Sequence, residues 1–138
     1  MRERLVRSAS AKRTTIRMAV TLPERALIVD EPWLELILAG DKDWEMRSRR
    51  TSVRGTVGLI RKGSGLVVGS VEIIDSLPAC SLEDMLAYQA RHRIPAGRLH
   101  ELASWRHPWV MRNPLRWAKP VPYRHPQGAV VWVRLEQA

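Results

Sequence analysis

Two β-rich runs separated by a short turn place the strongest constraint on how this chain can fold. The runs are Val53 to Arg61 and Leu66 to Ile74, and they flank Lys62-Gly63-Ser64-Gly65, a suitable hairpin turn. Glycines within both runs indicate bends or bulges, which let a small sheet curl. The pattern predicts a hairpin in a sheet that curls toward a barrel.

The segment before the hairpin is expected to contain a strand and a helix. Ala26 to Val29 is apolar and short, as in a buried strand. Pro32 suits the first turn of a helix, and the apolar residues between Trp33 and Leu38 recur at helical spacing. Gly40 is a good stop signal for that helix.

The second half of the chain predicts further helices and two more strands. Ser81 to Asp84 forms a variant of the capping box, and the apolar positions that follow predict an amphipathic helix over one barrel opening. A short helix is expected from Gly97 to Trp105, and strands at Trp109 to Met111 and Ala129 to Leu135. The predicted fold class is therefore α+β, a small β-barrel with flanking helices.

The charge of the chain favours an anionic partner. The 138 residues are enough for about one domain, and their net charge is +9. Residues 1–25 contribute +5 of that charge, so the remainder is basic as well. Nucleic acid is the commonest partner of such chains, although a basic balance that only aids solubility is the alternative. No apolar run approaches the roughly 18 residues that span a bilayer.

Residues 1–25 are predicted to be a flexible basic arm, and residues 26–138 a single domain. Residues 1–17 are rich in Arg, Ser, Thr and Ala and lack an apolar period. Met18 is a second possible start, and a transit peptide would share this composition. The lone Cys80 excludes an internal disulfide, and no secretory signal is evident, so a cytoplasmic setting is expected.

The most informative polar cluster lies between the helix and the hairpin. From Trp44 the hydrophobic period becomes two, so Glu45 and Arg47 are predicted to line a surface or cleft together with the preceding Lys42. A solvated strand edge with surface ion pairs is the simpler interpretation. Glu72 shifts the balance, because a carboxylate in an apolar strand is costly unless paired, and Lys42 or Arg47 is its expected partner.

The pattern Gly-x-Lys-x-x-Glu-x-Arg from Gly40 to Arg47 resembles the ASCH family, small domains related to the PUA RNA-binding fold. The resemblance covers residues 26–136 in order. Its other parts are Pro32-Trp33, Arg54-Gly55, Gly69 to Glu72, Trp109 to Asn113, Pro120 to Tyr123 and Gly128. It implies a PUA-like β-barrel whose cleft is lined by the Gly40–Arg47 segment and holds RNA, a nucleotide or a base.

One branch of small bacterial ASCH proteins hydrolyses N4-acetylcytidine with a lysine, a threonine and a glutamate. The resemblance places Lys42 and Glu72 at two of these positions, whereas Glu45 stands where the branch has its threonine. A carboxylate is a poor nucleophile for amide cleavage, but Glu45 can activate water while Lys42 stabilises an oxyanion. The candidate catalytic residues are therefore Lys42, Glu45 and Glu72.

The candidate ligand-binding residues combine basic and aromatic side chains. They are Lys42, Arg47, Trp33, Arg61, Lys62, Trp109, Arg112 and Tyr123. Trp109 stands before a basic loop that contains Arg112, an arrangement typical of single-strand binding, although burial of Trp33 and Trp109 in the core is equally compatible with the sequence. The histidine spacing fits no metal site, so neither a metal nor another cofactor is expected.

Three functions remain open at this point. The first is RNA, single-stranded nucleic-acid or nucleoside binding in the cleft. The second is a hydrolase, either an amidohydrolase on modified nucleosides such as N4-acetylcytidine or a ribonuclease. The third is an interaction module whose working part is the basic arm, and deletion of residues 1–17 separates it from the first. The sequence makes no prediction of oligomeric state or of RNA over DNA.

Overall fold

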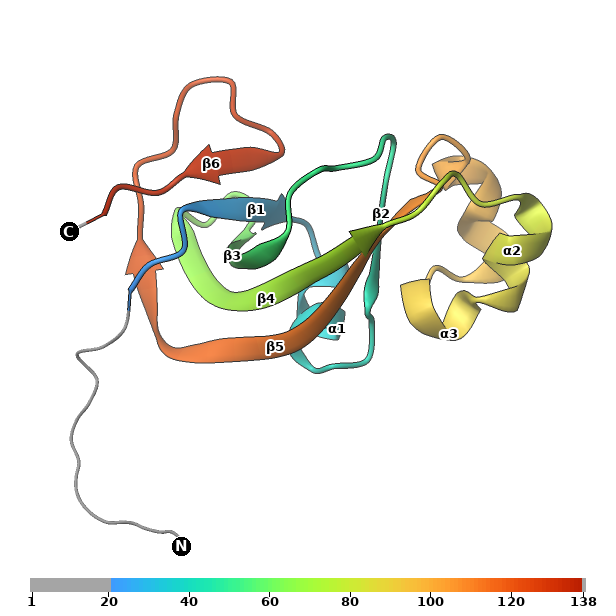
Figure 1. Ribbon diagram of the computed structural model, residues 1–138, viewed down its shortest axis with the longest axis horizontal. Helices are drawn as coiled ribbons and strands as arrows, with labels where there is room; N and C mark the ends of the chain where they lie inside the picture. The colour runs from blue at the N-terminus through green and yellow to red at the C-terminus, as the bar shows by residue number, and fades with distance from the viewer. Residues whose placement is uncertain (1–20, 138) are drawn as a thin grey trace, which may run out of the picture.

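The computed structural model describes residues 21–137 as a six-stranded sheet curled into a half-barrel (Figure 1). The strand order is β2-β5-β4-β3-β1-β6, and β1 and β3 are parallel while every other neighbouring pair is antiparallel. The strands are β1 (Arg25–Val29), β2 (Trp44–Arg47), β3 (Gly55–Arg61), β4 (Leu66–Ser76), β5 (His107–Pro122) and β6 (Trp132–Arg134). The predicted α+β class and the curled sheet are confirmed.

The β3–β4 hairpin forms where the sequence predicts it and supplies the curvature. The two strands pair from Gly55 opposite Ile73 onward, and the register shifts between Leu59 and Ile60. Gly69 lies so close to β5 that an added Cβ would be 2.4 Å from the Leu115 carbonyl oxygen. The glycine therefore permits two strands to approach where any side chain would collide.

Helix α1 (Trp33–Leu38) packs its apolar side into the half-barrel and ends as the sequence predicts. Leu34, Ile37 and Leu38 are buried against residues of β1, β3, β4 and β5. Gly40 follows the helix with a φ of 82°, a left-handed conformation that glycine adopts without strain, and its N–H donates to the Ile37 carbonyl. This turn delivers the chain directly to β2.

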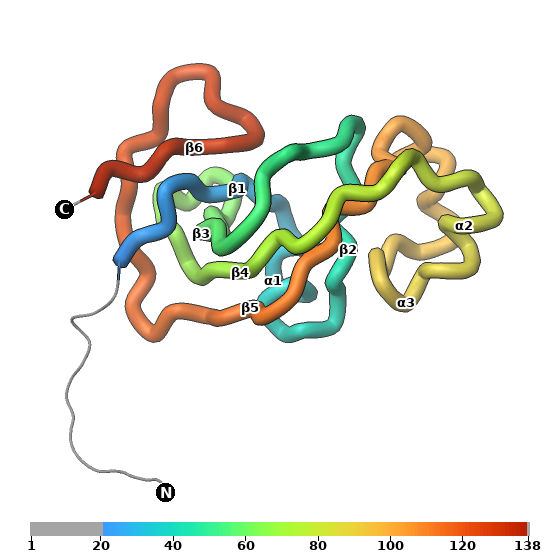
Figure 2. Tube along the Cα trace, viewed as in Figure 1, coloured from blue at the N-terminus to red at the C-terminus, as the bar shows by residue number. Residues whose placement is uncertain are grey.

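Residues 77–106, here called the helical excursion, lie at one end of the half-barrel (Figures 1 and 2). They contain α2 (Leu82–Ala87), α3 (Gln89–His92) and the 3₁₀ helix η3 (Ala96–Leu102). Ser81 and Asp84 form the predicted capping box. The predicted apolar face of α2 is wrong in part, because Met85 is buried while Leu82 and Leu86 are exposed.

Strand β5 corrects the prediction of a basic loop around Arg112. The strand runs for 16 residues, and its segment from Met111 to Pro122 pairs with β4 alone among the described residues, since β2 reaches only as far as Val110. Prolines are tolerated on such an edge because no neighbour needs their missing N–H. The prolines that suggest a loop in the sequence therefore mark an edge.

The predicted arm, residues 1–25, lies almost wholly outside the described residues, although Arg25 already belongs to β1.

Within residues 21–137, no helix is long and apolar enough to cross a membrane. Cys80 is buried, and burial raises the pKa of its thiol.

Candidate ligand cleft

The alternation along β2 sorts its four side chains as the sequence predicts. Trp44 and Met46 are buried against the helical excursion, in a cluster with Met85. Glu45 and Arg47 point the other way and line a cleft. One short strand therefore serves as core on one face and as the wall of a cleft on the other.

The cleft has a volume of about 640 Å³ and lies between β2, the β3–β4 hairpin, the helical excursion and the segment that joins β5 to β6. Its lining combines charged, aromatic and small residues. The residues that matter below are Trp33, Glu45, Arg47, Lys62, Arg98, Trp105, Tyr123, His125 and Val130. Its size is that of a typical small-molecule site.

Glu45 lies between two cations at the wall of the cleft. Its side chain is 5 % exposed. Arg47 binds its Oε2 through Nε at 3.0 Å and Nη2 at 2.9 Å, and Arg47 Nη2 also donates to the Ile28 carbonyl at 2.9 Å. Lys42 Nζ is 3.7 Å from Glu45 Oε1. The distance between Lys42 Nζ and Glu45 Oε1 is too long for a strong hydrogen bond, so Oε1 keeps acceptor capacity toward the cleft.

Lys42 lies behind Glu45 and does not reach the cleft surface. Its side chain is 1 % exposed, and Nζ donates to the His92 carbonyl at 2.6 Å and lies 5.1 Å from the centre of the Trp33 ring. Burial lowers the pKa of Lys42, and the nearby Glu45 carboxylate opposes that change. Lys42 therefore lies beside Glu45 and supports its carboxylate from behind, whereas the sequence predicts that Lys42 lines the cleft.

His92 fixes Lys42 from the helical excursion. The His92 ring is fully buried, with Nε2 2.6 Å from the Met85 carbonyl and Nδ1 accepting the Ile94 N–H at 2.9 Å. A carbonyl only accepts, so Nε2 carries the proton and the ring is neutral. Burial lowers the pKa of His92, which keeps it in that form.

Arg61 and Lys62 lie at the hairpin side of the cleft and are both paired. Arg61 binds the carboxylates of Glu31 and, at 2.9 Å, Glu35. Lys62 is 3.8 Å from an Asp30 oxygen, and its side chain is largely exposed. Only Lys62 of the two lines the cleft.

Glu72 does not join the Lys42 and Glu45 pair. Arg112 binds its carboxylate at 2.9 and 3.3 Å, and Asn113 donates to it at 3.1 Å. The expected pairing with Lys42 or Arg47 is therefore wrong, because Arg112 lies directly opposite Glu72 in the β4–β5 register. The Arg112 guanidinium lowers the pKa of Glu72, and neither residue lines the cleft.

The aromatic candidates divide between core and cleft. Trp109 is buried, donates from Nε1 to the Arg49 carbonyl and stacks on Trp132 with ring centres 5.8 Å apart. Such a ring cannot stack on a base, which supports the core alternative for Trp109. Trp33 is half-buried at the cleft, and Tyr123 lines it.

Sequence reasoning missed three residues that shape the cleft. Trp105 and Val130 are among the exposed large apolar side chains, at 43 % and 76 % exposure, and both line the cleft. Arg98 lines it too, with its guanidinium 5.8 Å from the Trp33 ring centre. For Trp105 the available sequence signal was an aromatic residue directly before a basic one, Arg106. The sequence around Val130 holds no such signal, since its position depends on how the segment after β5 folds back.

Among residues 21–137, no group of histidine, cysteine, aspartate or glutamate side chains is arranged to hold a metal ion. The four histidines do not gather, and His92 is engaged on both ring nitrogens.

The curled sheet with its short helices defines a PUA-like α+β domain. Its fold resembles the crystal structure of an ASCH protein from Zymomonas mobilis, with a TM-score of 0.60 and 12 % identity over 81 % of this chain and 87 % of that one. The ASCH domain model matches residues 27–121, so the chain belongs to the ASCH family. At the family level it is a PUA-like module of the RNA-binding type. A comparison with curated proteins finds no significant match.

Proposed function

We propose that the domain binds single-stranded RNA or a nucleotide and that the cleft holds one nucleobase. The observation that carries this proposal is the ion pair between the buried Glu45 and the partly buried Arg47 at the wall of a 640 Å³ cleft that has an exposed indole, Trp105, among its lining residues. A nucleobase has flat apolar faces and a polar edge. The lining offers a counterpart for each.

The edge of the base is matched by Glu45 and Arg47. Oε1 of Glu45 retains acceptor capacity toward an exocyclic amine or ring N–H, and Arg47 is a donor for ring nitrogen or carbonyl oxygen. The flat faces of the base are matched by Trp105 and Val130. Trp33 adds the part of its ring that Lys42 and Arg98 do not cover. Stacking on aromatic side chains and hydrogen bonding at the base edge are the usual means of reading an unpaired base.

Phosphate is a poorer occupant of the cleft wall than a base. Glu45 presents a negative charge there, and the Lys42 ammonium that would attract phosphate is sealed behind it. Lys62 and Arg98 are exposed lining residues, so the sugar–phosphate backbone belongs on their side. In this proposal Arg47 reads the base, Lys62 contacts phosphate, and the basic residues that precede β1 add salt-sensitive affinity.

The test is a titration of the full chain with short single-stranded RNA, compared with a Trp105→Ala variant. Loss of one stacked base costs about 1–3 kcal/mol, so the variant should bind roughly 5- to 150-fold more weakly. Tyr88→Ala is the matched control, since Tyr88 is an equally exposed aromatic of the helical excursion outside the cleft lining. Equal affinities of the wild type and both variants would exclude the cleft as the RNA site.

A hydrolase is the second candidate, and the position of Lys42 beside Glu45 favours it. Burial lowers the pKa of Lys42, and its Nζ lies 3.7 Å from a carboxylate that faces the cleft. Glu45 would act as general base on a water, with Lys42 supporting its charge. Glu72 would have no direct part unless it leaves Arg112.

The hydrolase is tested by incubating the protein with N4-acetylcytidine and with short RNA and following the products by mass. Turnover that disappears in Glu45→Gln and persists in Glu72→Gln would support it. RNA binding without any turnover leaves the binding function alone.

A further inference from the structure

We propose that a second hollow beside the cleft binds the next nucleotide of the same strand, so that the ligand is an oligonucleotide rather than a free nucleoside. This inference rests on the proposed function of the cleft. It rests chiefly on Tyr123 and Arg124, which both line that hollow.

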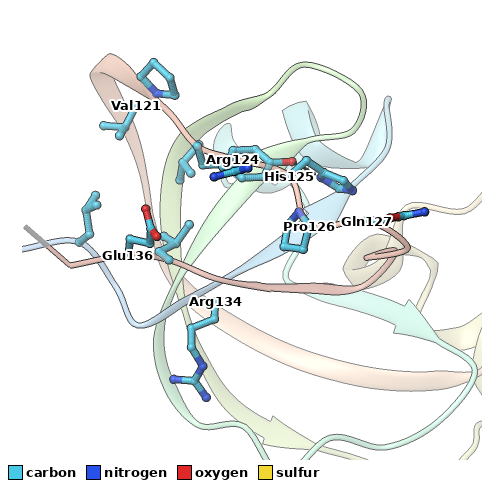
Figure 3. Close-up of a pocket in the computed structure, with 12 residues that line it drawn as sticks. Val121, Arg124, His125, Pro126, Gln127, Arg134 and Glu136 are labelled. Atoms are coloured by element: carbon cyan, nitrogen blue, oxygen red, sulfur yellow. Dashed lines mark hydrogen bonds between the residues drawn. The ribbon is translucent and has the colours of Figure 1, made fainter.

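The second hollow lies between the segment after β5 and the C-terminal tail (Figure 3). Its volume is about 810 Å³, which is larger than the cleft itself. Arg124 and His125 stand on one side of it, and Glu136 comes from the tail after β6 on the other. The hollow is thus large enough for a nucleotide.

Tyr123 and His125 separate the two hollows and line both of them. The Tyr123 hydroxyl is 2.7 Å from His125 Nδ1, and His125 Nε2 is 2.9 Å from the Ala129 carbonyl. The carbonyl only accepts, so in the neutral ring Nε2 donates to it and Nδ1 accepts from Tyr123. These two bonds hold the Tyr123 side chain at the boundary between the two hollows, and burial raises the pKa of its hydroxyl.

A wall shared by two hollows is the arrangement that consecutive bases require. An unstacked strand can place one base on each side of an aromatic ring, and such rings are the usual platforms for successive bases. Val121 and Pro122 add apolar surface on the outer side of Tyr123. The continuity of the two hollows through Tyr123 favours one extended ligand over two separate small molecules.

The charges in the second hollow suit a phosphodiester. Arg124 is exposed in it and makes none of the ion pairs formed within residues 21–137. Arg134 also lines the hollow, but it binds Glu24 at 3.2 Å and points away from Arg124 in Figure 3. Arg124 is therefore the cation available to the phosphate that links the two nucleotides.

The test compares the affinities of mononucleotides and dinucleotides for the full chain. The four nucleoside 5′-monophosphates are titrated first, and then the RNA dinucleotides that carry the best-bound base at either end. A second stacked base should tighten binding roughly 5- to 150-fold. Arg124→Gln should reduce that gain and lower the salt dependence of dinucleotide binding by about 0.7 in the log–log slope.

Arg54→Gln is the matched control, because Arg54 is an exposed arginine that lines neither hollow. It should leave the dinucleotide gain intact. Mononucleotides and dinucleotides that bind equally would overturn the second subsite and leave the cleft in place. An equal gain in wild type and Arg124→Gln would overturn the role of Arg124. Failure of every nucleotide to bind would overturn the proposed function itself.

Discussion

Replacing Glu45 by glutamine tests whether the cleft wall depends on a buried charge. Glutamine keeps the shape and the acceptor oxygen of the side chain but removes its negative charge. Lys42 and Arg47 then face each other across a neutral amide, although each retains one backbone carbonyl as a partner, from His92 and Ile28 respectively. The folded state should lose stability because an uncompensated charge remains buried.

The expected loss is about 3 kcal/mol. Removing one partner of a buried ion pair typically costs about 3–5 kcal/mol. The lower end applies here, since the amide oxygen can still accept from Arg47, whose side chain is 13 % exposed. Each unit by which the substitution further lowers the pKa of Lys42 costs about 1.4 kcal/mol. This cost is limited because Lys42 can release its proton and so lose the buried charge. A domain of ordinary stability, about 5–15 kcal/mol, would remain folded.

The assay is urea unfolding of wild type, Glu45→Gln and Glu72→Gln at neutral pH. Glu72→Gln is the same chemical change at an exposed ion pair, with Arg112, and its effect should be a small fraction of the Glu45→Gln effect. A Glu45→Gln variant that is as stable as Glu72→Gln would refute the reasoning. That result would mean that Glu45 does not compensate the charges of Lys42 and Arg47.

Three further predictions concern the stability effects of Lys42, Gly69 and Ser81. Burial lowers the pKa of Lys42 in the folded state, so between that lowered pKa and about 10.4 the unfolded chain binds the proton more tightly. The free energy of unfolding of the wild type minus that of Lys42→Met should therefore rise as the pH approaches about 10.4, and a constant difference would contradict the assigned burial. Gly69→Ala should cost at least about 1–3 kcal/mol in urea unfolding, because the new Cβ would meet the Leu115 carbonyl at 2.4 Å, whereas unchanged stability would show that β4 and β5 can separate. Ser81→Ala should cost about 1 kcal/mol by removing the cap of α2, and a loss below about 0.3 kcal/mol would mean that the helix does not depend on it.

Local sequence signals predicted most elements of the fold. The β3–β4 hairpin, the stop at Gly40 and the capping box at Ser81 all depend on residues within a few positions of one another. The same is true of the alternation in β2, which predicted that Glu45 would line a surface or a cleft, and Glu45 lines a cleft in the structure. Each signal is a matter of backbone preference or side-chain period, so it can be read without knowledge of the rest of the chain.

The amino-acid sequence by itself determined which side chains of β2 are buried and which two, Glu45 and Arg47, lie on the opposite face. Tertiary structure decided what the charged residues do. Lys42 donates to the carbonyl of His92, fifty residues away. Glu72 pairs with Arg112 because the β4–β5 register places the two residues opposite each other. The cleft itself is closed by Trp105, Tyr123 and Val130, which come from distant segments. Pairing partners and cavity walls depend on strand register and on how connecting segments fold back, and neither is contained in a local pattern.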